Sequence, residues 1–226
     1  STLLFTPSRD ADQNLRREGH PEEQIHFVGN VMVDTLLRFR DRASESDVLH
    51  RLEVEPGNYA VLTLHRPSNV DEAGRFAGVL DAVARVADDL PVIYPMHPRS
   101  SKMLIELGLA ERAESTPGLR LTGPMNYLEF IELESRALFV MTDSGGIQEE
   151  TTVLGVPCMT LRPNTERPVT ISEGTNQLVG TQPEDIVSAA KRVIAGQWRA
   201  PGGVPELWDG RAAERIVDVL EESGMR

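Results

Sequence analysis

The stretch ALFVMTDSGGIQEETTVLGVPCMTLR, residues 137–162, contains the pattern that decides the fold. An apolar run ends at Thr142, two glycines then open a helix over residues 145–154, and a second apolar run follows Gly155. Parallel strands need a crossover connection of this kind, usually a helix that packs on a face of the sheet. The stretch therefore predicts a strand, a helix and a second strand of one parallel sheet.

The same alternation runs along the whole chain. Residues 58–66, NYAVLTLHR, are apolar at nearly every central position, as expected of a strand that helices cover on both faces. We expect strands at residues 1–8, 25–30, 58–66, 91–97, 119–124, 137–144, 157–162 and 176–180. We expect helices at residues 9–18, 31–42, 76–86, 102–107, 127–135, 145–154, 184–195 and 212–222. This order predicts an α/β fold, a doubly wound Rossmann-like parallel sheet in a single domain, residues 1–226.

Composition and charge exclude several classes of protein. The chain has 23 Lys and Arg against 35 Asp and Glu, a net charge of −12, which argues against a general nucleic-acid surface. No apolar run approaches the roughly 20 residues of a membrane span. Cys158 is the only cysteine, which suits a reducing cytoplasm. No Cys/His or carboxylate spacing indicates a metal site, and no G-x-G-x-x-G follows the first strand. We expect a cytoplasmic protein with no metal, cofactor, nucleic-acid or membrane partner.

Ligands of doubly wound sheets bind beyond the carboxyl ends of strands, and loops 29–30, 65–66, 97–98 and 144–146 follow such ends. In the last of them, Gly145 and Gly146 would expose backbone N–H groups to a phosphate at the positive end of a helix dipole, and Ser144 adds a hydroxyl. Glu150 lies one turn further on the same face, where it can accept both hydroxyls of a ribose. The set suits a nucleoside diphosphate. The alternative is that Asp143 or Ser144 caps the helix and the glycines permit a tight turn.

Three further residues carry chemistry in the same region. His65 directly follows a strand, where it can act as a proton donor for a phosphate leaving group or as a surface histidine beside a turn. Arg167 can hold phosphate oxygens in a bidentate manner, or pair with a nearby glutamate. His97 stands in MHPRS, where a turn role is the favoured interpretation.

Several motifs converge on one family. They are TLHRPSNVD (63–71), PMHPRS (95–100), TDSGGIQEETTVLGVPCMTLR (142–162), NTERP (164–168), EGTNQLVG (173–180) and PELWDGRAAERIV (205–217). Together they resemble the UDP-N-acetylglucosamine 2-epimerases of the non-hydrolysing bacterial type. The resemblance implies two Rossmann-like domains arranged as in GT-B glycosyltransferases, with the active site between them. This chain resembles the second, UDP-binding domain, and residues 3–19 resemble the segment after the interdomain crossing, so the first domain is expected to be absent.

The resemblance also implies an activity. Members interconvert UDP-GlcNAc and UDP-ManNAc for cell-surface polysaccharide biosynthesis, by anti elimination of UDP to 2-acetamidoglucal and re-addition after C2 is reprotonated on the other face. The carboxylates that handle the C2 proton are expected in the absent domain. The implied partners are UDP and UDP-N-acetylhexosamines, and the full-length form is expected to be a homodimer.

By motif, the resemblance assigns a role to each candidate residue. It implies that His65 assists the leaving group and that Arg167 holds the active-site anion. The UDP would be bound by the remaining residues: phosphate by Ser144, Gly145 and Gly146, the ribose diol by Glu150, and the uracil by Phe130 beside it, with backbone near Met125 reading the base. The resemblance also implies that Arg66 and His97 belong to an activator site for a second UDP-GlcNAc.

Two positions depart from the family pattern. Ser68 stands where the family often has Glu, which puts the activator site in question, and Val169 stands where an acidic residue is common, which concerns the sugar pocket. The alternatives are a UDP-sugar binding module without turnover, a hydrolysing epimerase that releases ManNAc, and a GT-B glycosyltransferase.

Overall fold

Six parallel strands form the main sheet of the structure, a computed structural model that describes residues 1–224. The sheet order is β5-β4-β3-β6-β7-β8, and every pairing is parallel. The strands are β3 (Ala60–Thr63), β4 (Val92–Pro95), β5 (Leu119–Thr122), β6 (Phe139–Thr142), β7 (Cys158–Thr160) and β8 (Asn176–Leu178). The chain winds outward from β3 in one direction and from β6 in the other, which confirms the predicted doubly wound sheet.

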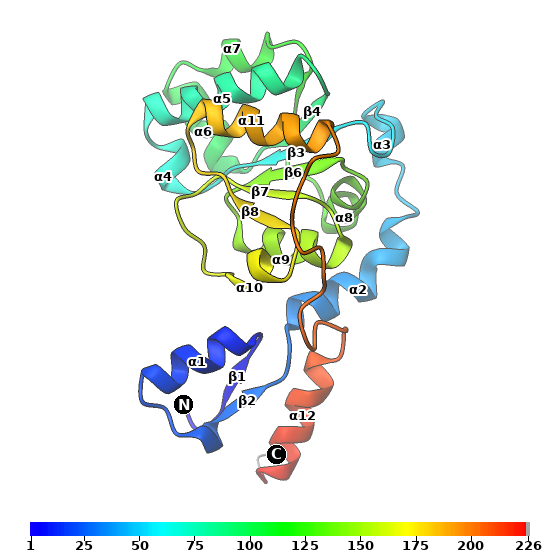
Figure 1. The fold of residues 1–226 in the computed structure, drawn as a ribbon. Helices are drawn as coiled ribbons and strands as arrows, with labels where there is room; N and C mark the ends of the chain where they lie inside the picture. The colour runs from blue at the N-terminus through cyan, green and yellow to red at the C-terminus, as the bar shows by residue number, and fades with distance from the viewer. Residues whose placement is uncertain (225–226) are drawn as a thin grey trace.

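Helices cover both faces of this sheet (Figure 1). One face packs against α4 (Pro67–Val70), α5 (Ala73–Ala87), α6 (Pro98–Glu106), α7 (Ala110–Glu114) and α11 (Pro183–Ile194). The other face packs against α3 (Val48–Arg51), α8 (Tyr127–Ser135) and α9 (Gly145–Leu154). Outside these lie α2 (Val31–Ala43), which contacts α8 and α9, and α10 (Val169–Ser172), which contacts α9 and β8.

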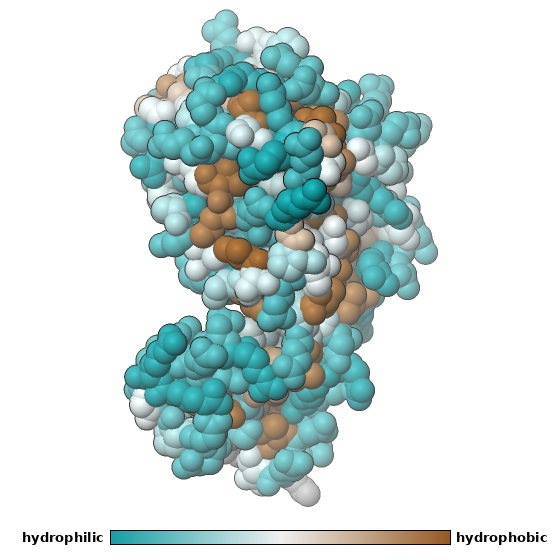
Figure 2. Space-filling model, viewed as in Figure 1, coloured by the Kyte–Doolittle hydropathy of each residue, from teal (hydrophilic) through white to brown (hydrophobic). Residues whose placement is uncertain are grey.

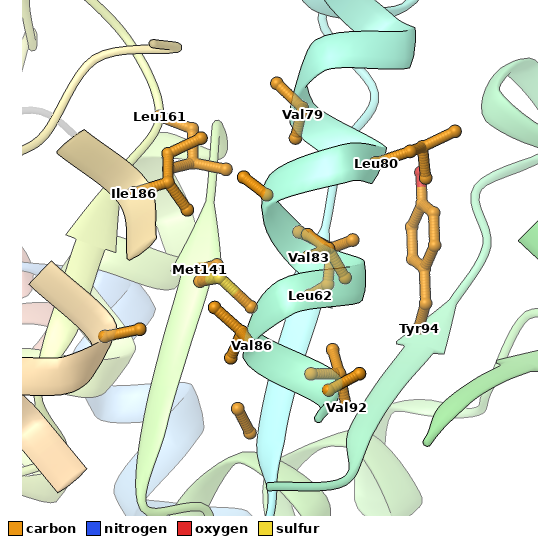
Figure 3. Close-up of a cluster of buried hydrophobic side chains, with 14 of the residues drawn as sticks. Leu62, Val79, Leu80, Val83, Val86, Val92, Tyr94, Met141, Leu161 and Ile186 are labelled. Carbon is orange, nitrogen blue, oxygen red and sulfur yellow. The ribbon is translucent and has the colours of Figure 1, made fainter. Parts of the chain in front are cut away.

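The core explains why the β3 sequence is apolar at successive positions. Leu62 of β3 lies with Tyr94 and Met141 of the neighbouring strands beneath α5 (Figure 3). Val61 points to the opposite face and packs with Leu133 of α8. All five side chains are fully buried. Because successive strand residues face opposite sides, a strand between two helical layers must be apolar on both.

The first two strands depart from the predicted single sheet. β1 (Leu4–Thr6) and β2 (Ile25–Phe27) pair in parallel with each other in a separate two-stranded sheet. They are connected by α1 (Arg9–Arg17) and the 3-10 helix η1 (Glu22–Gln24), and with α12 (Ala212–Glu222) they form the smaller part below the main sheet in Figure 1. Their residues are mostly half-buried, unlike the buried central strands. Alternation of strands and helices predicts parallel pairing, but it does not tell which sheet a strand joins.

Contacts near the C-terminus join the two parts. The indole N–H of Trp208 donates to the carbonyl oxygen of Pro7 at 2.8 Å. Asp34 of α2 accepts from the backbone N–H groups of Ala212 and Ala213, at 3.0 and 2.7 Å, and so caps the start of α12. A notch remains between the two parts on the face in Figure 2.

The longer predicted helices are confirmed, with α8, α9 and α12 at the expected bounds. Helices α3, α4, α7 and α10 were not predicted because four or five residues are too few for an apolar period to show. Among residues 1–224, no helix combines the length and apolar character that crossing a membrane requires.

Candidate functional site

The centre of the main sheet is a topological switch point. β3 and β6 are neighbours, paired from Ala60 with Phe139 to Thr63 with Thr142, and their crossovers lead in opposite directions. The loops after the two strands therefore diverge and leave a crevice beyond the carboxyl ends, where open α/β sheets bind ligands. Two of the predicted motifs meet there, because His65 follows β3 and Ser144 follows β6.

Asp143 joins these two loops. Its side chain is fully buried, and its Oδ1 lies 2.9 Å from Nδ1 of His65. The backbone N–H groups of His65 and Arg66 donate to the same carboxylate at 3.1 and 2.9 Å, and the Asn69 amide donates at 3.1 Å. These bonds hold the His65 ring beside β6 and leave Nε2 as the ring nitrogen that does not contact Asp143. The alternative that Asp143 caps the following helix is wrong.

A cavity of about 410 Å³ opens at these strand ends. Its lining includes five residues that the sequence marked as candidates: His65, His97, Met125, Phe130 and Ser144. The remaining lining residues are Thr63, Leu64, Pro95, Met96, Pro98, Pro124 and Ile147. A mainly apolar cavity with a few polar groups in its lining is typical of a small-molecule site.

The start of α9 has backbone donors that no side chain satisfies. Ser144 is the N-cap residue, yet its side chain makes no capping hydrogen bond, so the predicted alternative of a Ser144 cap is also wrong. Gly145 and Gly146 do not have positive φ. Apart from the adjacent residues and the backbone of the helix itself, a Cβ added to either would meet its nearest atom, among the described residues, at 3.9 Å or more. The packing of the chain therefore does not require glycine at these positions, and their bare backbone is available to an anion.

Arg167 lies beside this helix start. Its Nε is 2.5 Å from Oε1 of Glu149, and a Cβ on Gly145 would lie 4.0 Å from the same Nε. Glu149 is 3% exposed; burial raises the pKa of its carboxyl, while the Arg167 charge opposes that rise. Both side chains line a second cavity of about 240 Å³, together with the loop of Gly29 and Asn30 that follows β2. Of the four predicted loops, three meet at the first cavity and this one lies at the second.

Glu150 lies deeper, between α8 and α9. It is 6% exposed, and the Tyr127 hydroxyl donates to its Oε1 at 3.1 Å. Burial raises the pKa of Glu150, and hydrogen bonds from Tyr127 and Glu134 oppose the rise. Glu134 of α8 is fully buried, and burial together with the negative charge of Glu150 raises its pKa well above the ordinary range. Sequence analysis did not identify Tyr127 or Glu134 as partners of Glu150, because the contact depends on how α8 packs on α9.

Arg66 and His97, the two residues of the predicted activator site, make contacts with different parts of the protein. His97 caps α6, since its Nδ1 accepts from the backbone N–H of Arg99 at 3.1 Å, which agrees with the turn role favoured by its sequence. Its ring centroid is also 5.7 Å from that of His65. Arg66 points instead toward Glu166, at 3.5 Å. Within residues 1–224, no group of three or more His, Cys, Asp or Glu side chains could hold a metal ion.

The family model described as UDP-N-acetylglucosamine 2-epimerase matches residues 1–221. The chain belongs to this family. A family relative, the UDP-N-acetylglucosamine 2-epimerase of Methanocaldococcus jannaschii, is 37% identical over 227 residues, which cover 97% of this chain and 61% of the relative. The UDP-2,3-diacetamido-2,3-dideoxy-D-glucuronate 2-epimerase of Pseudomonas aeruginosa is 34% identical over 223 residues, which cover 97% of this chain and 60% of that relative. The chain thus spans less than two thirds of the length of either relative.

Solved structures of the family share this fold. The crystal structure of the Methanocaldococcus jannaschii enzyme in complex with UDP-GlcNAc and UDP matches with a TM-score of 0.86 at 37% identity, over 98% of this chain and 61% of that one. The Neisseria meningitidis enzyme bound to UDP-GlcNAc matches with a TM-score of 0.83 at 26% identity, and the match covers 98% of this chain and 62% of that enzyme.

The two departures from the family pattern lie outside the first cavity. Ser68 is in α4, and its carbonyl oxygen accepts from the Arg75 guanidinium at 3.0 Å. Val169 is 7% exposed and packs with Val33 and Trp208 in an apolar cluster. A valine at this position therefore serves the core between α10 and α2.

Proposed function

We propose that this chain is the C-terminal, UDP-binding part of a UDP-N-acetylglucosamine 2-epimerase, which interconverts UDP-GlcNAc and UDP-ManNAc by elimination and re-addition of UDP. The observation that carries the proposal is the meeting of three features at the ends of β3 and β6: the uncapped glycine start of α9, the His65–Asp143 pair and an apolar cavity. Membership of the family supports the same substrate class.

The diphosphate would bind at the start of α9. The N–H groups of the first turn point outward without a side-chain partner, and the helix dipole adds partial positive charge. Arg167 stands beside Gly145 and can add a charge-assisted hydrogen bond. The chain has a net charge of −12, so these local donors must overcome the repulsion between the protein and an anionic ligand.

The nucleoside would extend from that point along α8 and α9. Phe130 and Met125 line the cavity and offer an aromatic ring and an apolar surface to the uracil. Glu150 lies toward α8, and its remaining acceptor sites suit the ribose diol.

His65 is the residue that we assign to the leaving group. Breaking the C1–O bond transfers the bonding electron pair to a β-phosphate oxygen of UDP, and the proton lost from C2 must go to a base. Asp143 occupies Nδ1, so Nε2 is the atom from which His65 would donate a hydrogen bond or a proton to the departing oxygen. We assign the base at C2 to another part of the protein.

Two observations support a larger protein. The chain spans 61% of the length of the Methanocaldococcus jannaschii relative. β1 and β2 form a parallel sheet with two strands only in the described residues, whereas parallel sheets normally have more strands and covered faces. We therefore infer that β1, β2 and α12 adjoin a further domain and that the active site lies between the two. That the full-length form is a cytoplasmic homodimer stays a prediction. A role of Arg66 and His97 in activation stays a prediction.

Calorimetry tests the nucleotide site. UDP should bind clearly more tightly than uridine, because the α9 start and Arg167 act on the diphosphate. UDP should also bind more tightly than 2′,3′-dideoxy-UDP, and Glu150→Gln should weaken UDP binding by about 1.5–3 kcal/mol. Equal affinity for UDP and uridine would refute the phosphate site, and equal affinity for UDP and the dideoxy analogue would remove Glu150 from it.

Turnover separates the remaining alternatives. We expect residues 1–226 to bind UDP without interconverting the two sugars, and a full-length protein to do both. Proton NMR in deuterated water measures exchange at C2 and identifies the product. Deuterium incorporation by the isolated chain at the full-length rate would place the base within these residues. Free ManNAc released by the full-length protein would indicate a hydrolysing enzyme. Transfer of the sugar to an acceptor would indicate a GT-B glycosyltransferase. Binding without turnover would indicate a binding module.

A further inference from the structure

A second glutamate lies against the one proposed to bind ribose. Glu134 is 0% exposed, its two carboxyl oxygens are buried without a donor among residues 1–224, and the charge of Glu150 acts on it from the neighbouring helix. Both residues are on packed helices, Glu134 in the last turn of α8 and Glu150 in the middle of α9. Nothing in the mechanism above uses Glu134.

The surroundings supply no other partner for this carboxyl. Neither carboxyl oxygen of Glu134 accepts a hydrogen bond from a donor among residues 1–224. Within the same residues, no Lys, Arg or His forms an ion pair with Glu134 or Glu150. The titratable groups that face the pair are Tyr127 from α8, Glu149 from α9 and Cys158 from β7. None of them is a cation.

Two ionised carboxylates cannot occupy this position. An ionised carboxylate only accepts hydrogen bonds, so a contact between two carboxyl groups requires a proton on one of them. Burial without a counter-charge and repulsion between like charges both favour that proton. Tyr127 already donates to Glu150, and Glu150 is on the helix whose start faces the cavity. The proton therefore belongs on Glu134, which lies deeper and has no other donor.

We propose that Glu134 is a positioning residue for nucleotide binding: as a neutral carboxylic acid it donates a hydrogen bond to Glu150 and holds Glu150 as the ionised acceptor of the ribose hydroxyls. The proposal rests on the proposed function, since it needs a ribose at Glu150. With Tyr127 and Glu134 as two donors on one side, the Glu150 carboxylate is fixed in rotation and its free lone pairs are directed to the ligand.

Calorimetry with UDP and 2′-deoxy-UDP measures this role through the affinity ratio of the two ligands. In the parent protein we expect UDP to bind about tenfold more tightly than the deoxy ligand. Glu134→Gln should keep this ratio, because an amide can still donate to Glu150. Glu134→Leu removes the donor, and the ratio should fall to about two. Glu132→Leu is the matched control: it removes another buried glutamate of α8, one that pairs with Arg136, and should leave the ratio unchanged.

A second measurement does not depend on how the leucine variant folds. In protein labelled with ¹³C at the glutamate carboxyl carbons, one signal should show a protonated carboxyl at about pH 7, and Glu134→Gln should remove it. The proposal would be overturned if all glutamate carboxyl signals were those of ionised groups. It would also be overturned if Glu134→Gln and Glu134→Leu changed the affinity ratio equally, or if neither changed it. If the parent protein does not distinguish UDP from uridine, the proposed function fails instead, whatever the NMR signal.

Discussion

The Nδ1 atom of His65 lies 2.9 Å from Oδ1 of Asp143, the residue that directly follows the neighbouring strand. The same carboxylate accepts from the backbone N–H groups of His65 and Arg66. One buried side chain therefore fixes both the loop after β3 and the ring that this loop carries. A histidine whose Nδ1–H donates to a carboxylate has a defined tautomer, and its Nε2 is free to act on a ligand.

Asp143→Asn should disturb the ring more than the fold of the sheet. The amide has a single acceptor oxygen for the donors that the two carboxylate oxygens now share, so the ring loses its fixed tautomer. We expect ¹⁵N NMR to detect a mixture of His65 tautomers, and kcat of the full-length enzyme to fall by about two orders of magnitude or more with a smaller change in KM. Asp41→Asn, at a 95% exposed side chain, is the control. An unchanged tautomer with normal kcat would refute the positioning role.

The two glycines at the start of α9 give a test that separates binding from folding. Gly146→Ala should leave stability unchanged or raise it by up to about 1 kcal/mol, because alanine favours the helix and meets no close neighbour. The same methyl group should weaken UDP binding, since it stands where a phosphate approaches the backbone. Thermal unfolding and calorimetry on one sample measure both effects.

Gly155→Ala is the matched control for that variant. Gly155 ends α9 with φ of +73°, so alanine there should cost about 1 kcal/mol of stability and leave UDP affinity unchanged. If Gly146→Ala binds UDP as the parent does, the bare backbone of Gly146 does not hold phosphate.

Arg167 should act on the diphosphate and not on the nucleoside. Arg167→Ala is expected to reduce UDP affinity by about tenfold or more, and to leave uridine affinity unchanged, because only the diphosphate carries negative charge. Arg192→Ala, on the exposed side of α11, should alter neither. A parallel loss of UDP and uridine binding would mean that Arg167 supports the fold through Glu149 rather than the phosphate.

The sequence predicts features that depend on neighbours along the chain. The bounds of α9 followed from the glycines that begin and end it. The gathering of His65, His97 and Ser144 followed from one rule, that parallel strands end at the same edge. These features are local, or follow from the order of strands.

Features that depend on packing between distant elements were not predictable in this way. Strands β1 and β2 read like the others, but they form a sheet of their own, next to a residue far along the chain, Trp208, which donates to the carbonyl oxygen of Pro7. Asp143 could have been found, since it follows β6 as His65 follows β3. Glu134 could not, because IELES in residues 131–135 gives no sign that this glutamate faces another helix.

Glu134 also predicts how stability depends on pH. Burial and the charge of Glu150 raise the pKa of Glu134 in the folded state above its unfolded value of about 4.3. The folded protein then keeps a proton that the unfolded chain releases. Its stabilising effect is complete below about pH 4.3 and is lost as the pH rises toward the folded pKa, at up to about 1.4 kcal/mol per pH unit.

Glutamine cannot lose a proton, so Glu134→Gln should become more stable relative to the parent as the pH rises. The free energies of unfolding of the variant and the parent, measured in urea at about pH 5 and about pH 8, should differ more at the higher pH. Glutamine can still donate a hydrogen bond to Glu150, so the contribution of Glu150 should largely cancel in the comparison. Glu45→Gln, at an exposed position, should follow the parent at both pH values. Parallel curves for Glu134→Gln and the parent would mean that Glu134 is already ionised in the folded protein, because only an ionised carboxyl adds no proton linkage in this range.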